Sequence, residues 1–367
     1  MPELWIAFGA VETLVTIQAE NLGSVVQPEA EKSTGETERS AQAVGQAAAL
    51  FICDSTPTTI ELLHDLTPGI SSAPGLKVVS AAPKRVESAV PELKGRVVTL
   101  PPPIPSAEGG QATFAQELTE GGKKIFLGTA RPDPLFGIAD PKVQACLNWV
   151  AGSRAEAARA RAELEPLPFH KTESYEKMED LAARIPGASF LTAVPRGGKV
   201  RAVLEDAPFD AIKNGFLESS VPQAKALIVG LGGRGYDDTL SSALRGVWNA
   251  LPAVKRSGSV LVVAEFSEGL GSTALEMLAT GRVSGEATKK KEKYVEGHEE
   301  IFYLNKLKDE YDVLLLSGLP EVYSGSKLGL TTARGSGEAV GRVLNKVGRS
   351  GKINVVTRAS ECRVVSA

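Results

Sequence analysis

Short apolar runs alternate along this chain with amphipathic segments, and the clearest example lies in the second half. Ala226–Val229 is an apolar, β-branched run typical of a buried strand. Apolar residues then recur every three or four positions from about Thr239 to Lys255, which predicts a helix that Gly258 ends. A second buried strand is predicted at Ser259–Ala264. This order of strand, helix and strand predicts a parallel sheet whose loops gather at the carboxyl ends of the strands.

The same alternation continues through the rest of the chain. Residues 4–18 alternate as in a β-hairpin with a turn near Gly9, and residues 19–40 are predicted to be a loop that leads into a helix. Further strands are predicted at 47–53, 76–80, 97–100, 123–127, 189–194, 199–204, 312–317 and 352–356, and further helices at 140–165, 172–185 and 273–280.

These elements predict an α/β fold of two domains, each a mainly parallel sheet flanked by helices, with a cleft between them. We place the domains at residues 1–223 and 224–367, and leave open whether the last strand returns to the first domain. The length of 367 residues and the hydrophobic fraction of 43% suit two cores of ordinary size.

Composition narrows the function. A net charge of −3 argues against a general nucleic-acid binder, and an aromatic content of 5% argues against a base-stacking surface. No apolar run is long enough to cross a membrane, and the first residues lack a secretory pattern. The cysteines are scattered and fit reduced thiols. We therefore expect a cytoplasmic protein that binds neither nucleic acid nor membrane, and we interpret the lysine run at 289–291 as solvated.

Polar residues follow two of the predicted strands in the first half. Asp54, Ser55 and Thr56 come directly after one strand and before a helix, a setting in which backbone N–H groups meet an anion. The alternative is that one of them only caps that helix. Arg131 and Asp133 follow another strand, either as an outward-facing surface pair or with Arg131 as a carboxylate-binding group.

Gly230, Gly232 and Gly235 form a GxGxxG sequence between a strand and a helix. One interpretation is a dinucleotide site, although Glu265, the acid that would bind the ribose, lies later than the usual spacing. A second is a tight turn shaped by glycine, and a third is one wall of a polar ligand cleft. The following aspartates, Asp237 and Asp238, can cap the helix.

The chain has only three histidines, His64, His170 and His298, and lacks the nucleophile elbow, the Walker loop and the HExxH zinc motif. A catalytic triad or a multi-histidine metal site is therefore not predicted. Carboxylates, arginines and hydroxyls at the strand ends remain as groups able to bind a small anion.

The sequence resembles the nickel-pincer-nucleotide lactate racemase family nearly from end to end. LIVGLGGRGYDD, at 227–238, resembles the Gly-Gly-Tyr and acid of that family, and the loop around Glu265 resembles its Glu-Gly-x-Gly loop. LFICDSTPTTIELL, at 50–63, resembles its strand followed by Asp-x-Thr-Arg-Pro, and GTARPDPLFG, at 128–137, resembles its Gly-Arg-x-Glu-Pro-His loop. The resemblance implies the family's two-domain fold and 2-hydroxyacid racemase chemistry.

Departures from the family concern its cofactor, the nickel pincer nucleotide. Arg131-Pro132-Asp133 stands where the family has Glu-Pro-His, and Asn148-Trp149 stands where it has Asn-His. The Gly-Gly-x-Lys loop that carries the cofactor is missing, and Lys142, which lies nearby, lacks the glycines. The cofactor that the resemblance implies thus lacks its ligands, so we leave the cofactor unknown.

The resemblance also aligns Ser242 and Arg245 with a substrate-side glutamine and lysine. We predict Asp133 as a general base and Arg245 as the holder of a substrate carboxylate. The other predicted ligand-binding residues are Asp54, Ser55, Thr56, Arg131, Asp238, Ser242 and Glu265, with no metal ligand.

The function expected is that of a divergent lactate racemase-family protein that binds a small anionic, 2-hydroxyacid-like ligand in the cleft between the domains, without the nickel pincer. Whether it is an enzyme stays open; an active form would be an isomerase of the racemase or epimerase type. The alternatives are a non-catalytic ligand-binding or partner-binding relative and a nucleotide-binding oxidoreductase that uses the Gly230 loop. The oligomeric state is not predicted.

Overall fold

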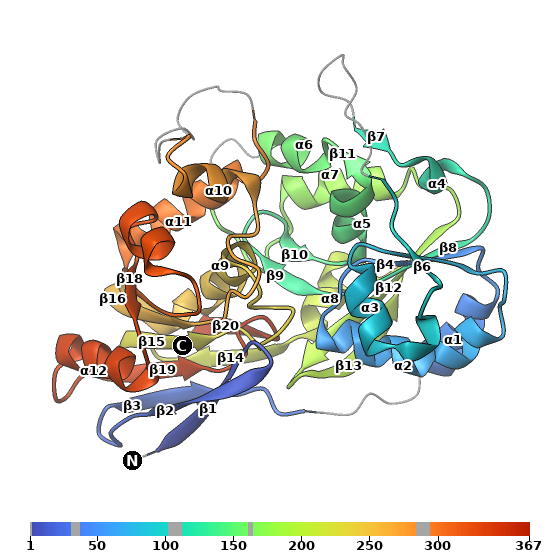
Figure 1. The fold of residues 1–367 in the computed structure, drawn as a ribbon. Helices are drawn as coiled ribbons and strands as arrows, with labels where there is room; N and C mark the ends of the chain where they lie inside the picture. The colour runs from blue at the N-terminus through green and yellow to red at the C-terminus, as the bar shows by residue number, and fades with distance from the viewer. Residues whose placement is uncertain (1, 31–36, 102–111, 161–163, 284–293) are drawn as a thin grey trace. The chain divides into compact units, whose positions relative to one another are not determined.

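The computed structural model describes residues 2–30, 37–101, 112–160, 164–283 and 294–367, and the predicted lysine run at 289–291 lies outside them. The chain forms two compact units, drawn in Figure 1. The terminal unit comprises Met1–Glu29, Pro132–Pro134 and Leu217–Ala367, and the central unit comprises Ala30–Arg131 and Leu135–Phe216.

The central unit is built on a six-stranded sheet in the order β13-β12-β8-β4-β5-β6. All neighbouring strands in it are parallel except β12 and β13, which form the predicted antiparallel hairpin. The strands of this sheet are β4 (Ala49–Ile52), β5 (Lys77–Ser80), β6 (Val97–Val98), β8 (Lys124–Thr129), β12 (Ala188–Arg196) and β13 (Lys199–Glu205). The short strands β7 (Thr113–Phe114) and β11 (Val150–Ala151) pair with each other, and β9 (Arg131–Asp133) and β10 (Gly137–Ala139) follow β8.

Alternating side chains of the central strands enter cores on the two faces of this sheet, as period-two alternation requires. Leu50 and Ile52 join the core beneath α2, whereas Phe51 lies on the other face and contacts Phe126 and Trp149. In Figure 1, α1 and α2 lie below β4 and β8, and α5 to α7 lie above them. The helices of this unit are α1 (Thr37–Gly45), α2 (Pro57–Ser71), α3 (Pro83–Ala89), η1 (Pro91–Leu93), α4 (Gln116–Thr119), α5 (Pro141–Trp149), α6 (Ser153–Ala160), α7 (Glu173–Ala182) and α8 (Phe209–Gly215).

The terminal unit contains a second six-stranded sheet, in the order β18-β17-β16-β15-β19-β3, and all its neighbouring strands are parallel. Its strands are β3 (Leu22–Val26), β15 (Ala224–Gly230), β16 (Val254–Val263), β17 (Asp312–Leu316), β18 (Thr331–Ala333) and β19 (Ile353–Val356). The hairpin β1 (Glu3–Phe8) and β2 (Val11–Thr16) and the parallel pair β14 (Leu217–Val221) and β20 (Cys362–Ser366) accompany it.

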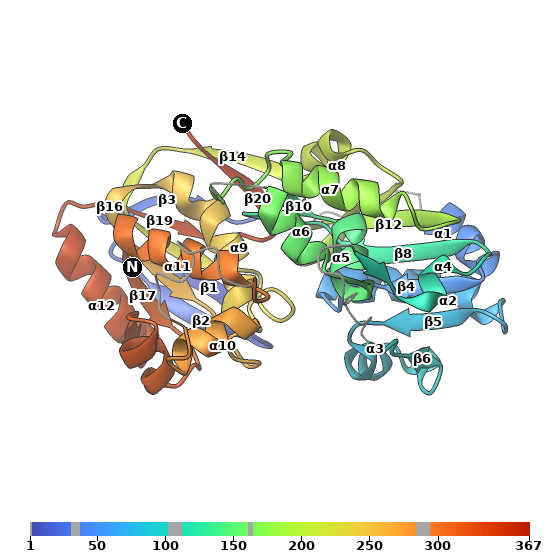
Figure 2. The ribbon, with the colours of Figure 1, turned by 90° about the horizontal axis from the view of Figure 1, so that it is seen from above.

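One face of the terminal sheet is covered by the hairpin and by α12 (Ser336–Val347), which share a core with Ile228 and Leu261. The helix α9 (Leu240–Ala250) packs against α11 (His298–Glu310), and α11 in turn lies against β17. The remaining helical segments are η2 (Leu251–Ala253), α10 (Thr273–Ala279) and the π-helix η4 (Val322–Lys327). Figure 2 shows the blue strands β1 and β2 and the red helix α12 within this one unit.

The units differ from the predicted domains, 1–223 and 224–367, in three places. The first 29 residues, Pro132–Pro134 and residues 217–223 lie in the terminal unit. The segment predicted as a loop contains β3, which adds to the edge of the terminal sheet beside β19. The last strand, β20, pairs with β14, and both belong to the terminal unit.

Two predicted helices are shorter than the periodicity indicates. The helix predicted from Thr239 to Lys255 ends at Ala250, because Pro252 lies in the short 3₁₀ turn that follows, and β16 then begins at Val254. The helix predicted over 140–165 is interrupted by β11, which is extended at Val150. Within the described residues, no helix is both long enough and apolar enough to cross a membrane.

Candidate functional site

Asp54 lies at the carboxyl end of β4 in the central unit and binds a cluster of threonines. Its Oδ1 accepts hydrogen bonds from the Thr56 amide at 2.9 Å and from the hydroxyls of Thr56 and Thr59 at 2.9 and 2.7 Å. Its Oδ2 accepts the Thr129 amide at 2.7 Å. Because each hydroxyl has one proton, Thr129 must donate its own proton to Thr56 or Thr59, 2.6 and 2.8 Å away.

This cluster ties the end of β4 to the end of β8 and starts α2. Thr56 is the N-cap of that helix and accepts the Thr59 amide, as the capping interpretation predicts. Ser55, between the two, is half-buried. Asp54 and Thr56 therefore form their hydrogen bonds with other groups of the protein.

Arg131 and Asp133 do not form the surface pair that was one interpretation of their spacing. Arg131 is half-buried, and its Nε has no hydrogen-bond partner among the described residues. Asp133 is only 3% exposed, and it pairs with a residue distant in sequence rather than with Arg131. The prediction that both side chains face outward is wrong for Asp133, because Pro132 and Pro134 on either side belong to the packed terminal unit with it.

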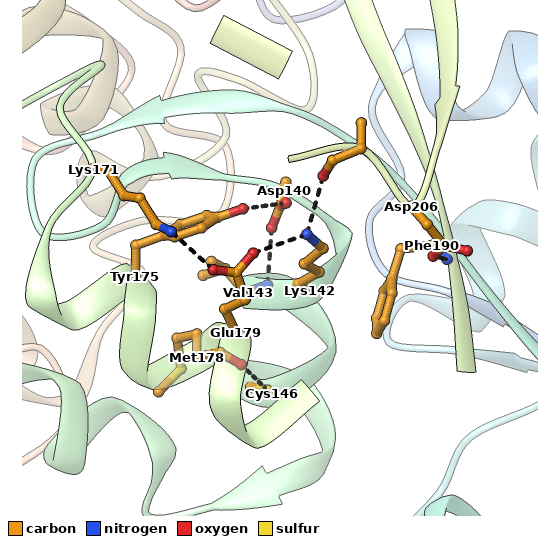
Figure 3. A network of polar contacts seen from close by, with 11 residues as sticks. Asp140, Lys142, Val143, Cys146, Lys171, Tyr175, Met178, Glu179, Phe190 and Asp206 are labelled. Atoms are coloured by element: carbon orange, nitrogen blue, oxygen red, sulfur yellow. Dashed lines mark hydrogen bonds and ion pairs between the residues drawn. The ribbon is translucent and has the colours of Figure 1, made fainter. Parts of the chain in front are cut away.

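Lys142 lies in a polar network of the central unit, drawn in Figure 3. Its ammonium group lies 3.2 Å from Glu179 Oε1 and donates to the Ala207 carbonyl at 3.0 Å. Glu179 also binds Lys171 at 3.0 Å. The neighbouring Asp140 is fully buried, caps α5 and accepts the Tyr175 hydroxyl at 2.9 Å, and burial raises the pKa of Asp140.

The glycines of the GxGxxG loop in the terminal unit are packed against the chain itself. A side chain at Gly230 would meet Ile6 and the Thr357 carbonyl, and one at Gly232 would meet Glu361 and Tyr236. These contacts match the interpretation of glycine as the residue that fits a crowded turn.

The N–H groups at the start of α9 also have partners inside the protein. The Leu240 and Ser241 amides donate to the Gly269 and Leu270 carbonyls, each at 3.0 Å, and the Ser242 amide donates to Thr239 Oγ1 at 3.1 Å. A phosphate at this helix end would need those donors and would face two aspartates. The geometry therefore does not favour a dinucleotide at the Gly230 loop.

The prediction that Asp237 or Asp238 caps α9 is wrong, because Thr239 is the N-cap of that helix. Asp237 is completely buried, and its Oδ2 accepts the Gly9 amide at 2.8 Å and the Glu265 amide at 3.3 Å. Its Oδ1 has no hydrogen-bond partner among the described residues. Burial, followed by the charges of Asp238 and Glu265, raises the pKa of Asp237, although the two amides oppose this shift. Asp238 accepts the Gly235 amide at 3.0 Å.

Arg245 on α9 forms an ion pair with Asp133. The Nε atom of Arg245 lies 3.2 Å from Asp133 Oδ2, and the two side chains are 18% and 5% exposed. Both belong to the terminal unit. Ser242, one turn earlier on the same helix, is half-buried and accepts the Thr239 hydroxyl at 3.0 Å. Burial strengthens the attraction between the two charges, so removing either one takes this ion pair away from a buried charge, which is costly.

The terminal unit thus contains Asp133, Asp238, Ser242, Arg245 and Glu265 of the predicted site, and the central unit contains the others. The position of Asp237 before a helix predicted only a capping role, and its burial next to other carboxylates carries no sequence signal. Among the described residues, no three histidines, cysteines or carboxylates gather as a metal ion would require.

Comparison with known proteins finds no family model and no curated protein that matches this chain. Among solved structures, the chain is similar to the lactate racemase apoprotein from Thermoanaerobacterium thermosaccharolyticum, with a TM-score of 0.71 and 14% identity. The match covers 99% of this chain and 100% of that chain. A likeness at this identity establishes the fold alone, and it confirms the prediction of an α/β fold with parallel sheets flanked by helices.

The residues at the positions that the family resemblance points to do not fit a nickel pincer cofactor. Trp149, which replaces a histidine, offers no metal-binding nitrogen and packs edge-on against Phe51 at 5.1 Å. Asn148 donates to the Cys53 carbonyl at 2.8 Å. Lys142 is held by Glu179, and Asp133 is held by Arg245. Each of these side chains is committed to a contact within the protein.

Proposed function

We propose that this chain is a lactate racemase-like protein that binds a small carboxylate of the 2-hydroxyacid class at Arg245, without the nickel pincer nucleotide. The observation that carries the proposal is the ion pair between Arg245 and Asp133, two charges that are largely removed from water. The similarity of the fold to a lactate racemase supports the choice of ligand class.

A guanidinium group recognises a carboxylate through parallel N–H···O bonds, and it does so best where water is excluded. The ligand carboxylate would replace Asp133 as the partner of Arg245, and the released Asp133 would accept a hydrogen bond from the 2-hydroxyl group. The half-buried Ser242 lies on the same helix and is a further group for the ligand oxygens.

The reaction class that this arrangement would serve is isomerisation at C2. Asp133 would take the proton from C2, and the electron pair would pass into the ligand carboxylate, where Arg245 would balance the charge. A water molecule on the opposite face would return a proton to C2 and invert the centre, and Asp133 would pass the proton that it took to solvent, so that the protons balance. The step needs no outside oxidant, because the same carbon loses and regains a proton.

Binding of D-lactate, L-lactate and propionate by isothermal titration calorimetry tests the proposal. We expect Arg245→Lys, which keeps the charge but loses the planar fork, to weaken both lactates by about tenfold. Asp133→Asn removes the competing anion and should tighten binding of propionate. Arg234→Lys is the matched control, because it makes the same substitution at an arginine that is exposed on the preceding loop.

Arg245→Ala alone would remove the ion pair of the buried Asp133 carboxylate. The double variant Arg245→Met with Asp133→Asn removes both charges of the pair and is therefore the test of complete removal. Lactate affinity that stays unchanged in this double variant, with a thermal melt like that of the wild type, would remove Arg245 from the binding site.

A further inference from the structure

A cavity of the terminal unit lies at the carboxyl ends of β16 and β17. Its volume is about 620 Å³, within the range of pockets that hold small molecules. The loop after β16, the loop after β17, α10 and the π-helix η4 form its walls. Parallel strands place their ligands at this edge, so the position is one where a binding site is expected.

Charge is distributed unevenly around this cavity. Glu265, Glu268 and Glu276 line it, and none of the described residues that line it is a lysine, arginine or histidine. Neither Glu265 nor Glu276 forms an ion pair with another residue in the described part of the chain. A lining of this kind repels a carboxylate or phosphate and attracts a cation.

The rest of the lining is apolar enough to hold a hydrocarbon stem. Leu270 and Leu319 are 8% exposed, and Pro320 lies beside Leu319 in the loop after β17. Tyr323, in the π-helix, is 43% exposed, so part of its ring is open at the wall of the cavity. An aromatic face at a pocket wall can contact a cation directly, and single-turn π-helices occur frequently at functional sites.

We propose that this cavity binds an organic cation, a compound that carries ammonium or guanidinium groups on a short aliphatic stem. The stem would lie against Leu270 and Leu319, and the cationic groups would lie among the three glutamates and over the Tyr323 ring. A bare metal ion would leave the apolar wall unused. Neither Arg245 nor Asp133 lines this cavity, and the cavity selects the opposite charge.

Three probes with the same six-carbon stem separate charge from shape. These are 1,6-diaminohexane, 1,6-hexanediol and adipate, each titrated into the full chain at low salt. We expect the diamine alone to bind, and its affinity to fall as sodium chloride screens the glutamates. Binding of adipate or equal binding of the diol would overturn the proposal, and so would failure of the diamine to bind.

Variants locate the site. Glu268→Gln combined with Glu276→Gln should weaken the diamine by about fivefold or more. Tyr323→Ala should weaken it further, whereas Tyr323→Phe keeps the aromatic face and should bind as the wild type does. The control, Glu12→Gln combined with Glu321→Gln, makes the same change of two charges on exposed residues that do not line the cavity.

Equal losses in the control and in the pocket variants would show that the diamine binds the acidic surface at large, which contradicts the proposal. Arg245→Lys should leave diamine binding unchanged. The test therefore fails or succeeds independently of the carboxylate site on α9.

Discussion

Asp54 and Asp237 each follow a buried parallel strand, β4 in the central unit and β15 in the terminal unit, yet their surroundings differ. Asp54 accepts four hydrogen bonds, and two of them come from threonine hydroxyls. Asp237 is more deeply buried, accepts two amides, and leaves Oδ1 without a hydrogen-bond partner among the described residues. Two further carboxylates, Asp238 and Glu265, repel a negative charge on Asp237 and so help to raise its pKa.

The comparison teaches that an acid at a strand end has no fixed role. In the central unit the carboxylate organises the chain around it and is fully used in doing so. In the terminal unit the fold keeps a buried carboxylate where burial and like charges disfavour ionisation, and such positions are concentrated at functional sites. The predictions below test this difference between the units.

The largest effect is expected for Asp54→Ala. The substitution leaves the Thr56 and Thr129 amides and two threonine hydroxyls without their acceptor, and we expect a loss of about 2–4 kcal/mol in the free energy of unfolding. Urea denaturation measures this loss. Ser55→Ala, at the half-buried neighbour, is the control and should change stability by less than about 0.5 kcal/mol. A loss no larger than that of the control would contradict a structural role for Asp54.

Gly9→Ala is expected to have the next largest effect. Gly9 has a φ of +56°, and a side chain there would meet the Glu265 carboxylate at 1.7 Å. We expect a loss of about 1–2 kcal/mol, the sum of left-handed backbone strain and displacement of Glu265. Gly95→Ala isolates the backbone part, because Gly95 has a φ of +74° and open space around it. Equal losses in urea denaturation would mean that Glu265 does not contact Gly9.

The smallest effect on stability is expected for Asp237→Asn, and this substitution should stabilise the protein, unlike the two before it. Burial raises the pKa of Asp237 above its ordinary value of 3.8, so the unfolded chain ionises first as the pH rises. The wild type therefore loses stability between that value and the raised pKa of the folded state, whereas asparagine does not titrate. We expect the variant to be more stable at neutral pH, by about 1 kcal/mol or less.

Thermal melts from about pH 3 to pH 7 check this sign. The advantage of Asp237→Asn should be absent at the acid end and should grow toward neutrality. A variant that is less stable than the wild type at pH 7 would mean that the ionised carboxylate is bound favourably, as Asp54 is.

Local pattern was sufficient to predict much of the fold. The strand at 226–229, the helix that follows it and the hairpin at 4–18 all depend on neighbouring residues, and each is present. The strand Leu22–Val26 was missed because Gly23 and Ser24 weaken its apolar pattern, and its stability comes from pairing with β19, far along the chain. Edge strands of this kind are determined by their partners.

The site was less predictable than the fold. The spacing of Asp133 and Arg245 gives no sign that they form an ion pair; only the resemblance to a family brought the two residues into one prediction. Asp237 and Asp238 were predicted as caps because they precede a helix, but Thr239 stands closer to its start. Burial and pairing across long separations decide these roles, and no local pattern encodes them.

The division of the terminal unit between both ends of the chain has a consequence for biosynthesis. Strand β3 and the hairpin are synthesised before the central unit, yet the sheet and core that accept them are completed only when β15 to β19 have been made. At ~5–20 residues per second, the intervening central unit occupies on the order of 10 s of translation. During that time β3 lacks the strand that it pairs with in the folded sheet, and its N–H and C=O groups form an unpaired edge.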